Sequence, residues 1–308
     1  MLNPVERLIA CTILLVAVVD IAFVVIKDVA VDVEGYAAAT LIGLFLLLSG
    51  LLYRRFRPAL RVSTALCGSG LFILFSLVGS TLNYTFLPTV NQSIDPFLMR
   101  FDTMLGYDWP SVVTFAAQHS WIGYTLFLVY ATSLPQLLLL VCWYGFSGDD
   151  RRLHHFLLTG TVGALASLIF WFFFPTFGAK SYNTLPQWVM ETIPLAVDPA
   201  YGRELLRLAA EGVSYLSPKN VLGLIAFPSF HIVMACMSLA FAPRLMPVRI
   251  LFYVVNVLMF PAVLVQGGHF LVDIAGGVIM FLLAWLVARA LLSRLNPERA
   301  PSTTLQVA

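Results

Sequence analysis

The feature that most constrains this chain is a series of eight long apolar runs, each closed by charged, proline or glycine residues. A helix needs roughly 20 apolar residues to cross the hydrocarbon core of a bilayer. The sequence is 60% hydrophobic and 11% charged, whereas soluble domains carry about 25% charged residues. We therefore predict an all-α integral membrane protein with about eight transmembrane helices, at residues 8–26, 36–53, 62–82, 121–145, 156–175, 224–242, 250–266 and 270–292.

The charges on the connecting segments predict the orientation of these helices. With the N-terminus placed in the cytoplasm, the inner segments hold 12 basic residues and the outer segments hold 6. Basic residues close to the spans favour the cytoplasmic side. We therefore expect both termini to be cytoplasmic, in an inner or plasma membrane of bacterial type. The formal charge of +2 gives no reason to expect a nucleic-acid partner.

Two outer segments are predicted to form amphipathic helices. In residues 95–106 the apolar side chains share one helical face, Asp95 is placed to cap the helix, and Arg100 and Asp102 fall off the apolar face. This helix is expected to lie in the membrane interface. The long segment 176–222 contains a second amphipathic stretch that is expected to act as a lid, because long connections are usually functional.

Three polar segments stand at the outer ends of different predicted spans. We call them the first segment (174–180), the second segment (227–231) and the third segment (266–273). The orientation derived from the charges puts all three on one side of the membrane. They are therefore expected to converge on one cleft.

The third segment contains His269 and Asp273, four residues apart. On a helix this spacing brings the two side chains together, so the carboxylate can hold one ring nitrogen and leave the other free to attack. Gly267 and Gly268 precede the pair and let a substrate oxyanion approach the helix N-terminus, which favours phosphate. A His–Asp pair that only ties two helix ends together is the alternative interpretation.

The other two segments supply residues of complementary chemistry. His231, one turn into a helix opened by Pro228, suits a general acid that protonates a leaving alkoxide. The Ser229 hydroxyl can donate to an anion, and Lys180 can neutralise phosphate charge. Each of these residues alone is more often a capping or solvated residue, and their occurrence on one face favours a site.

These motifs resemble the type 2 phosphatidic acid phosphatase (PAP2) superfamily. Phe-Pro-Ser-Phe-His at 227–231, Gly-Gly-His-Phe-Leu-Val-Asp at 267–273 and Phe-Asp-Thr-Met-Leu-Gly at 101–106 are similar to its inositol phosphorylceramide synthase-like branch. The resemblance implies a six-helix core preceded by two extra helices. It divides the chain into N-terminal transmembrane helices (1–90, the third span belonging to the core), a catalytic region (91–293) and a disordered cytoplasmic tail (294–308).

The resemblance also implies residue roles. His269 would form a phosphohistidine, Asp273 would orient it, and His231 would protonate the leaving group. Lys180, Ser229 and Gly268 would bind the phosphate, with no metal or cofactor. The implied substrate is a lipid phosphate or phospholipid, and the acceptor is water or a polar alcohol such as inositol.

The sequence departs from the superfamily pattern at three positions. Gln187 and Val263 stand where the superfamily has arginines, and Phe230 stands where it has glycine. Phosphoryl transfer needs fixed positive charge. The outer residues expected to supply it are Arg100, Arg203, Arg207 and Lys219.

Two other functions fit parts of the pattern. In a transporter, Asp20 within the first span and the histidines would form a proton relay. In a metal-dependent hydrolase, His231, His269 and Asp273 would be two-histidine, one-carboxylate ligands. The phosphoryl-transfer interpretation is the one that uses the glycines and Lys180 as well.

Overall fold

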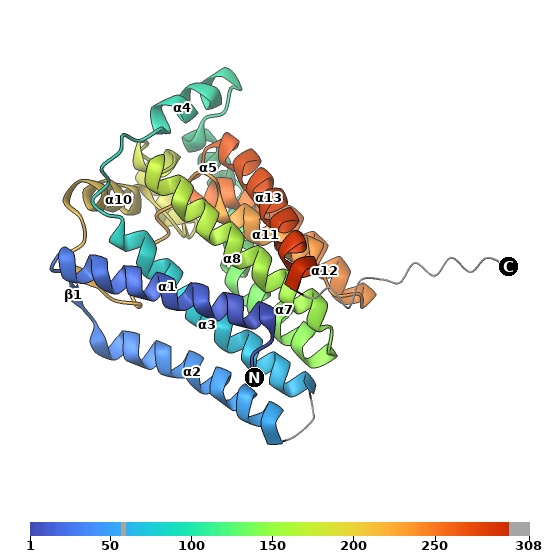
Figure 1. Cartoon of the computed structure of the whole chain (residues 1–308). Coiled ribbons are helices and arrows are strands. Elements are labelled where there is room, and N and C mark those ends of the chain that lie inside the picture. Colours follow the sequence, from blue (N-terminus) through green and yellow to red (C-terminus); the bar gives the residue numbers. More distant parts are fainter. Residues whose placement is uncertain (57–59, 296–308) are drawn as a thin grey trace.

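Long apolar helices dominate the computed structural model, which describes residues 1–56 and 60–295 (Figure 1). Six helices in the described part are long and apolar enough to cross a membrane. They are α1 (Pro4–Ile26), α2 (Val33–Phe56), α3 (Leu60–Thr85), α8 (Asp150–Phe173), α12 (Met246–Gly267) and α13 (Leu271–Leu295). The prediction of an all-α membrane fold is confirmed at this level.

The predicted number of eight spans is not confirmed. The predicted span 121–145 is two helices, α6 (Ser120–Ala131) and α7 (Ser133–Ser147). Helix α5 (Trp109–Gln118) meets α6 at an angle of 112°, and this bent pair gives a seventh span if it is counted as one. The predicted span 224–242 contains only α11 (Phe230–Ala240), which is about 16 Å long at 1.5 Å per residue.

Short helices cover one end of the bundle. They are α4 (Asp95–Met104), the 3₁₀ turn η1 (Ala179–Ser181), α9 (Gln187–Thr192) and α10 (Pro199–Glu211). Helices α4 and α10 form within the segments predicted to be amphipathic, and Asp198 caps α10 by accepting the Tyr201 N–H. Of the predicted tail, residues 294 and 295 belong to α13, and the remainder lies outside the described residues.

The two N-terminal helices pack mainly on α3. Close approach of α2 depends on glycine, because a Cβ atom on Gly43 would lie 2.6 Å from Leu74 Cγ. Helix α1 begins with a capping box, in which Asn3 and Glu6 each accept the other's backbone N–H. At the far end of α1, Lys27 Nζ donates to the carbonyls of Thr85, the last residue of α3, and of Leu87 just after it.

A two-residue parallel bridge joins distant loops at this far end. Strand β1 (Ala30–Val31), between α1 and α2, pairs with β2 (Tyr215–Leu216), between α10 and α11. Asp32 extends the bridge by accepting the Ser217 hydroxyl at 2.7 Å. Figure 1 shows α10 near the β1 end of α1, whereas the N-terminus lies at the other end.

The three polar segments connect the helices at the end covered by α4 and α10. The first segment follows α8, the second opens α11, and the third is the turn from α12 to α13. The turn requires glycine, since Gly268 has φ 61° and ends α12 in the left-handed region.

Candidate active site

Polar contacts join all three segments pairwise. The Thr176 hydroxyl accepts the Phe227 N–H at 2.7 Å, which links the first segment to the second. The Lys180 N–H donates to the Gly268 carbonyl at 3.3 Å, and the Ser229 N–H donates to the Asp273 carbonyl at 3.2 Å. The three segments therefore converge in the structure, as expected.

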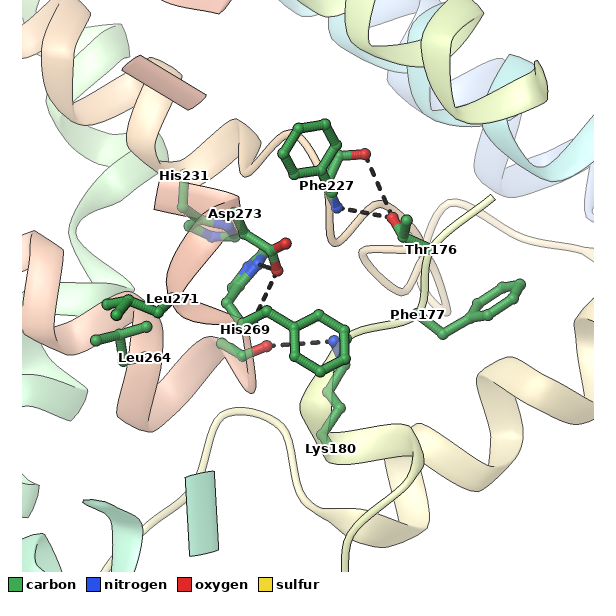
Figure 2. Close-up of polar contacts among 12 residues, drawn as sticks. Thr176, Phe177, Lys180, Phe227, His231, Leu264, His269, Leu271 and Asp273 are labelled. Atoms are coloured by element: carbon green, nitrogen blue, oxygen red, sulfur yellow. Dashed lines mark hydrogen bonds and ion pairs between the residues drawn. The ribbon is translucent and has the colours of Figure 1, made fainter. Parts of the chain in front are cut away.

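The His269 and Asp273 side chains are in direct contact. His269 Nδ1 lies 2.9 Å from Asp273 Oδ2, and the two side chains are 3% and 0% exposed. Figure 2 shows this contact beside Lys180. Gly267 leaves room for the ring, because a Cβ atom there would lie 2.5 Å from His269 Cδ2. The geometry is that of an imidazole oriented by a carboxylate.

Lys180 lies against the same turn. Its Nζ donates to the Gly267 carbonyl at 3.2 Å, and a Cβ atom on Gly268 would lie 2.6 Å from Lys180 Cβ. The absence of side chains at the glycine pair thus lets this buried lysine approach His269. We infer that the glycines serve this approach as well as the turn.

His231 reaches the site from α11. Figure 2 shows its imidazole near the pair formed by His269 and Asp273. Tyr130 of α6 stacks on its ring with centroids 4.3 Å apart, and the tyrosine hydroxyl lies 3.4 Å from Nδ1. Ser229 is fully buried, and its Oγ has no hydrogen-bond partner among the described residues. A buried hydroxyl without a partner is available to a ligand.

The amides at the start of α13 differ from their expected role. The Phe270 N–H donates to Asp273 Oδ2 at 2.9 Å, and the Leu271 N–H donates to both carboxylate oxygens of Asp102, at 3.1 and 3.2 Å. Protein carboxylates therefore occupy the helix N-terminus that was expected to bind phosphate. Gly268 lies beside Lys180, and its role in phosphate binding stays a prediction.

Sequence reasoning missed the part that α4 plays in the site. Asp95 was expected to cap α4, but the helix cap is Ile94. The Asp95 carboxylate instead accepts the N–H groups of Phe177 and Gly178 in the first segment. Asp102, which lies off the apolar face as expected, is 5% exposed. Asp95 and its partners in the first segment lie more than 80 residues apart in the chain, so no local spacing in the sequence indicates this contact.

The electrostatics of the site follow from burial. Burial lowers the pKa of the Lys180 ammonium to about 8, while the carboxylates of Asp273 and Asp95 act in the opposite direction. Burial and the Lys180 charge lower the pKa of His269, so its imidazole is neutral at pH 7 and has a lone pair for attack. Burial raises the pKa of Asp102 to about 6.

In the part of the chain that the structure describes, the expected basic residues form no ion pair with the site. Arg207 is paired with Glu204 and Glu211 on the exposed side of α10. Arg100, Arg203 and Lys219 are exposed, and among the described residues none forms an ion pair with the site. Val263 lies in the hydrophobic core, and the Gln187 amide donates to Glu191. Lys180 is therefore the cation of this site within the described residues.

Residues 96–287 match the family model of the PAP2 superfamily. The chain belongs to the PAP2 superfamily. The matched region includes His231, His269 and Asp273, and it supports a phosphatase or phosphotransferase activity for the protein at this general level. No curated protein and no solved structure matches the chain significantly.

Superfamily membership does not favour the two other functions considered from the sequence. Asp20, the carboxylate of the transporter interpretation, is buried on α1, and its Oδ1 has no hydrogen-bond partner in residues 1–56 and 60–295. It forms no hydrogen bond with the three polar segments. In the same residues, no group of three or more His, Cys, Asp or Glu side chains is arranged to hold a metal ion.

Proposed function

We propose that this PAP2 superfamily protein transfers a phosphoryl group, or a phosphate-linked headgroup, from a membrane lipid through a phosphohistidine on His269. The observation that carries the proposal is the buried contact of 2.9 Å between His269 Nδ1 and Asp273, with Lys180 and His231 beside it. In this arrangement the second ring nitrogen of His269 is the nucleophile.

The reaction has two steps. His269 Nε2 attacks the phosphorus, and the bond from phosphorus to the leaving oxygen breaks. His231, whose protonated form is favoured by the negative charge of the bound phosphate, gives its proton to that oxygen. Neutral His231 then takes a proton from the acceptor, whose oxygen attacks phosphorus and releases His269. Asp273 stabilises the imidazolium character that His269 develops. Water as acceptor makes a phosphatase, and an alcohol such as inositol makes a synthase.

The charge balance of the site favours a phosphodiester over a phosphomonoester. Lys180 is the buried cation, while Asp95, Asp102 and Asp273 are buried carboxyl groups. Interactions between charges strengthen where water is excluded. A phosphodiester brings one negative charge and a monoester dianion brings two, so the diester is repelled less. We infer that the donor is a phospholipid with a phosphate-linked headgroup.

We expect the purified protein in detergent to turn over a phosphoinositide or another phospholipid diester at least about tenfold faster than phosphatidic acid, a difference of about 1.4 kcal/mol in activation free energy. Inorganic phosphate, the phosphorylated headgroup that a diester releases and new lipid products are measured together, with and without added inositol. Turnover of phosphatidic acid alone, with release of inorganic phosphate, would contradict the diester assignment and leave a lipid phosphatase.

Phosphohistidine chemistry and metal chemistry predict opposite responses to inhibitors. Vanadate accepts a bond from a histidine nitrogen and adopts five-coordinate geometry, so we expect it to inhibit, and we expect EDTA to have no effect. Both are measured as dose–response curves on the same substrate. Strong inhibition by EDTA that a divalent metal reverses would instead support His231, His269 and Asp273 as metal ligands.

The charge distribution predicts that the site faces the periplasm or the cell exterior. A cysteine at Thr184, an exposed position after the first segment, should react with an impermeant maleimide added to intact cells, in a background without the native cysteines. A reporter fused after Arg299 should report the cytoplasm.

Labelling of the Thr184 cysteine only after the membrane is opened, together with an external C-terminal reporter, would reverse the orientation. The three polar segments would still share one side. Their substrate pool would then be the inner leaflet and the cytosol instead of the outer leaflet.

A further inference from the structure

Helix α4 has three distinct faces. Asp95, Leu98 and Asp102 follow the spacing of one helical face, and all three are buried. A second face carries the exposed apolar side chains Phe97, Phe101, Met104 and Leu105. The third face carries the exposed polar side chains Arg100 and Thr103. A helix with apolar and polar faces side by side suits the boundary between lipid and water.

The buried face of α4 holds the first segment through Asp95. Its carboxylate accepts the Phe177 N–H at 2.9 and 3.1 Å, the Gly178 N–H at 3.2 Å and the Tyr182 hydroxyl at 2.9 Å. Phe177 and Gly178 lie three and two residues before Lys180. The position of the lysine therefore depends on where α4 lies.

The same face holds the third segment through Asp102. Both of its carboxylate oxygens accept the Leu271 N–H, two residues after His269. Tyr107, just beyond α4, donates its hydroxyl to the His269 carbonyl at 3.2 Å. Asp102 and Tyr107 thus hold the backbone at His269 and just after it.

The lipid bilayer is the partner that suits the exposed apolar face of α4. Helix α4 has 10 residues and contacts the start of α13, and α13 is a candidate membrane span. At about 15 Å the helix is too short to cross the bilayer. Figure 1 places it at the bundle end that carries the site. Phe97 and Phe101 are 59% and 41% exposed there, as expected for side chains that enter the acyl boundary.

We propose that α4 lies in the lipid interface with its apolar face in the bilayer, and that Asp95 and Asp102 are positioning residues which hold Lys180 and His269 relative to each other. The second part rests on the roles proposed above for these two residues. The first part is independent of any activity.

The lipid contact is tested by a fluorescent probe on single cysteines, in the cysteine-free protein reconstituted in phosphatidylcholine–phosphatidylglycerol vesicles. Phe101→Cys places the probe on the apolar face, and Thr103→Cys is the matched control on the polar face. We expect a shallow doxyl-labelled lipid to quench the probe at 101 at least about twofold more than at 103, because an interfacial helix buries its apolar face. Equal quenching, or stronger quenching at 103, would overturn the lipid contact.

The positioning role is tested by kinetics. Asp102→Ala removes the acceptor for the Leu271 N–H, and Asp108→Ala is the control, because Asp108 caps α5 in the same way by accepting the Ser111 N–H. We expect Asp102→Ala to lower kcat about tenfold to a hundredfold with little change in KM, as for a misplaced catalytic group. Asp102→Asn keeps an acceptor oxygen and should recover most of kcat, while Asp108→Ala should keep it.

Equal loss of kcat in the two alanine variants, or no recovery in Asp102→Asn, would overturn the positioning role. If Asp102→Ala does not fold, Tyr107→Phe removes only the bond to the His269 carbonyl and should also lower kcat at constant KM. An unchanged kcat in Tyr107→Phe would then overturn the role. Lack of activity in the unsubstituted protein on all lipid phosphates would count against the proposed function and leave the probe experiment intact.

Discussion

Replacement of His269 by asparagine should reduce turnover by about 10³-fold or more, because an amide can neither attack phosphorus nor carry it as a phosphoramidate. The variant should still fold, since asparagine fits the space of the imidazole and can keep a hydrogen bond to Asp273. The measurement is turnover of the lipid substrate, with the thermal unfolding midpoint as a check on folding.

The matched control for this variant is His119→Asn. His119 is an exposed histidine between α5 and α6 whose ring contacts the Phe115 carbonyl at 3.0 Å, and we expect its replacement to leave turnover nearly unchanged. If His269→Asn kept more than a few percent of the turnover, the covalent-histidine mechanism would be wrong.

Replacement of His231 by alanine should be almost as damaging for a lipid substrate. General acid catalysis contributes about 10² to 10⁴ in rate when the leaving group is an alkoxide. An activated aryl phosphate needs no proton on its leaving oxygen, so His231→Ala should lose much less activity on it. The ratio of the two losses, measured under the same conditions, reports the role of His231.

Equal losses on the two substrates would point to another role for His231. Tyr130→Phe provides a useful comparison, because it keeps the ring that stacks on the imidazole and removes the hydroxyl near Nδ1. If the hydroxyl only supports the orientation of His231, Tyr130→Phe should lose less activity than His231→Ala. The loss should again be larger on the lipid substrate than on the aryl phosphate.

Local spacing made part of this site predictable. The spacing of four residues predicted that His269 and Asp273 would meet, and they do so at 2.9 Å, although His269 lies two residues before α13 begins. The segments containing Lys180 and His231 were expected nearby because the charge pattern put them on the same side. Their chemical roles remain predictions.

Other contacts in the site depend on how the helices pack against each other, and this packing cannot be predicted from local spacing in one sequence. Asp102 meets the Leu271 N–H, and Tyr130 meets His231, across helices that are far apart in the chain. The same limit explains the number of spans. Apolar composition predicted one helix at 121–145, but composition does not reveal the interruption at Thr132 between α6 and α7.

The bridge between β1 and β2 bears on how far this protein can be shortened from its N-terminus. The match to the superfamily begins at residue 96, which would suggest a minimal catalytic unit that starts there. Yet Ala30 pairs with Tyr215 and Asp32 holds Ser217, in the loop that leads to His231. A shortened protein would leave β2 with an unpaired edge in that loop. The evolutionary boundary of the family and the physical boundary of a separable enzyme are therefore different in this chain.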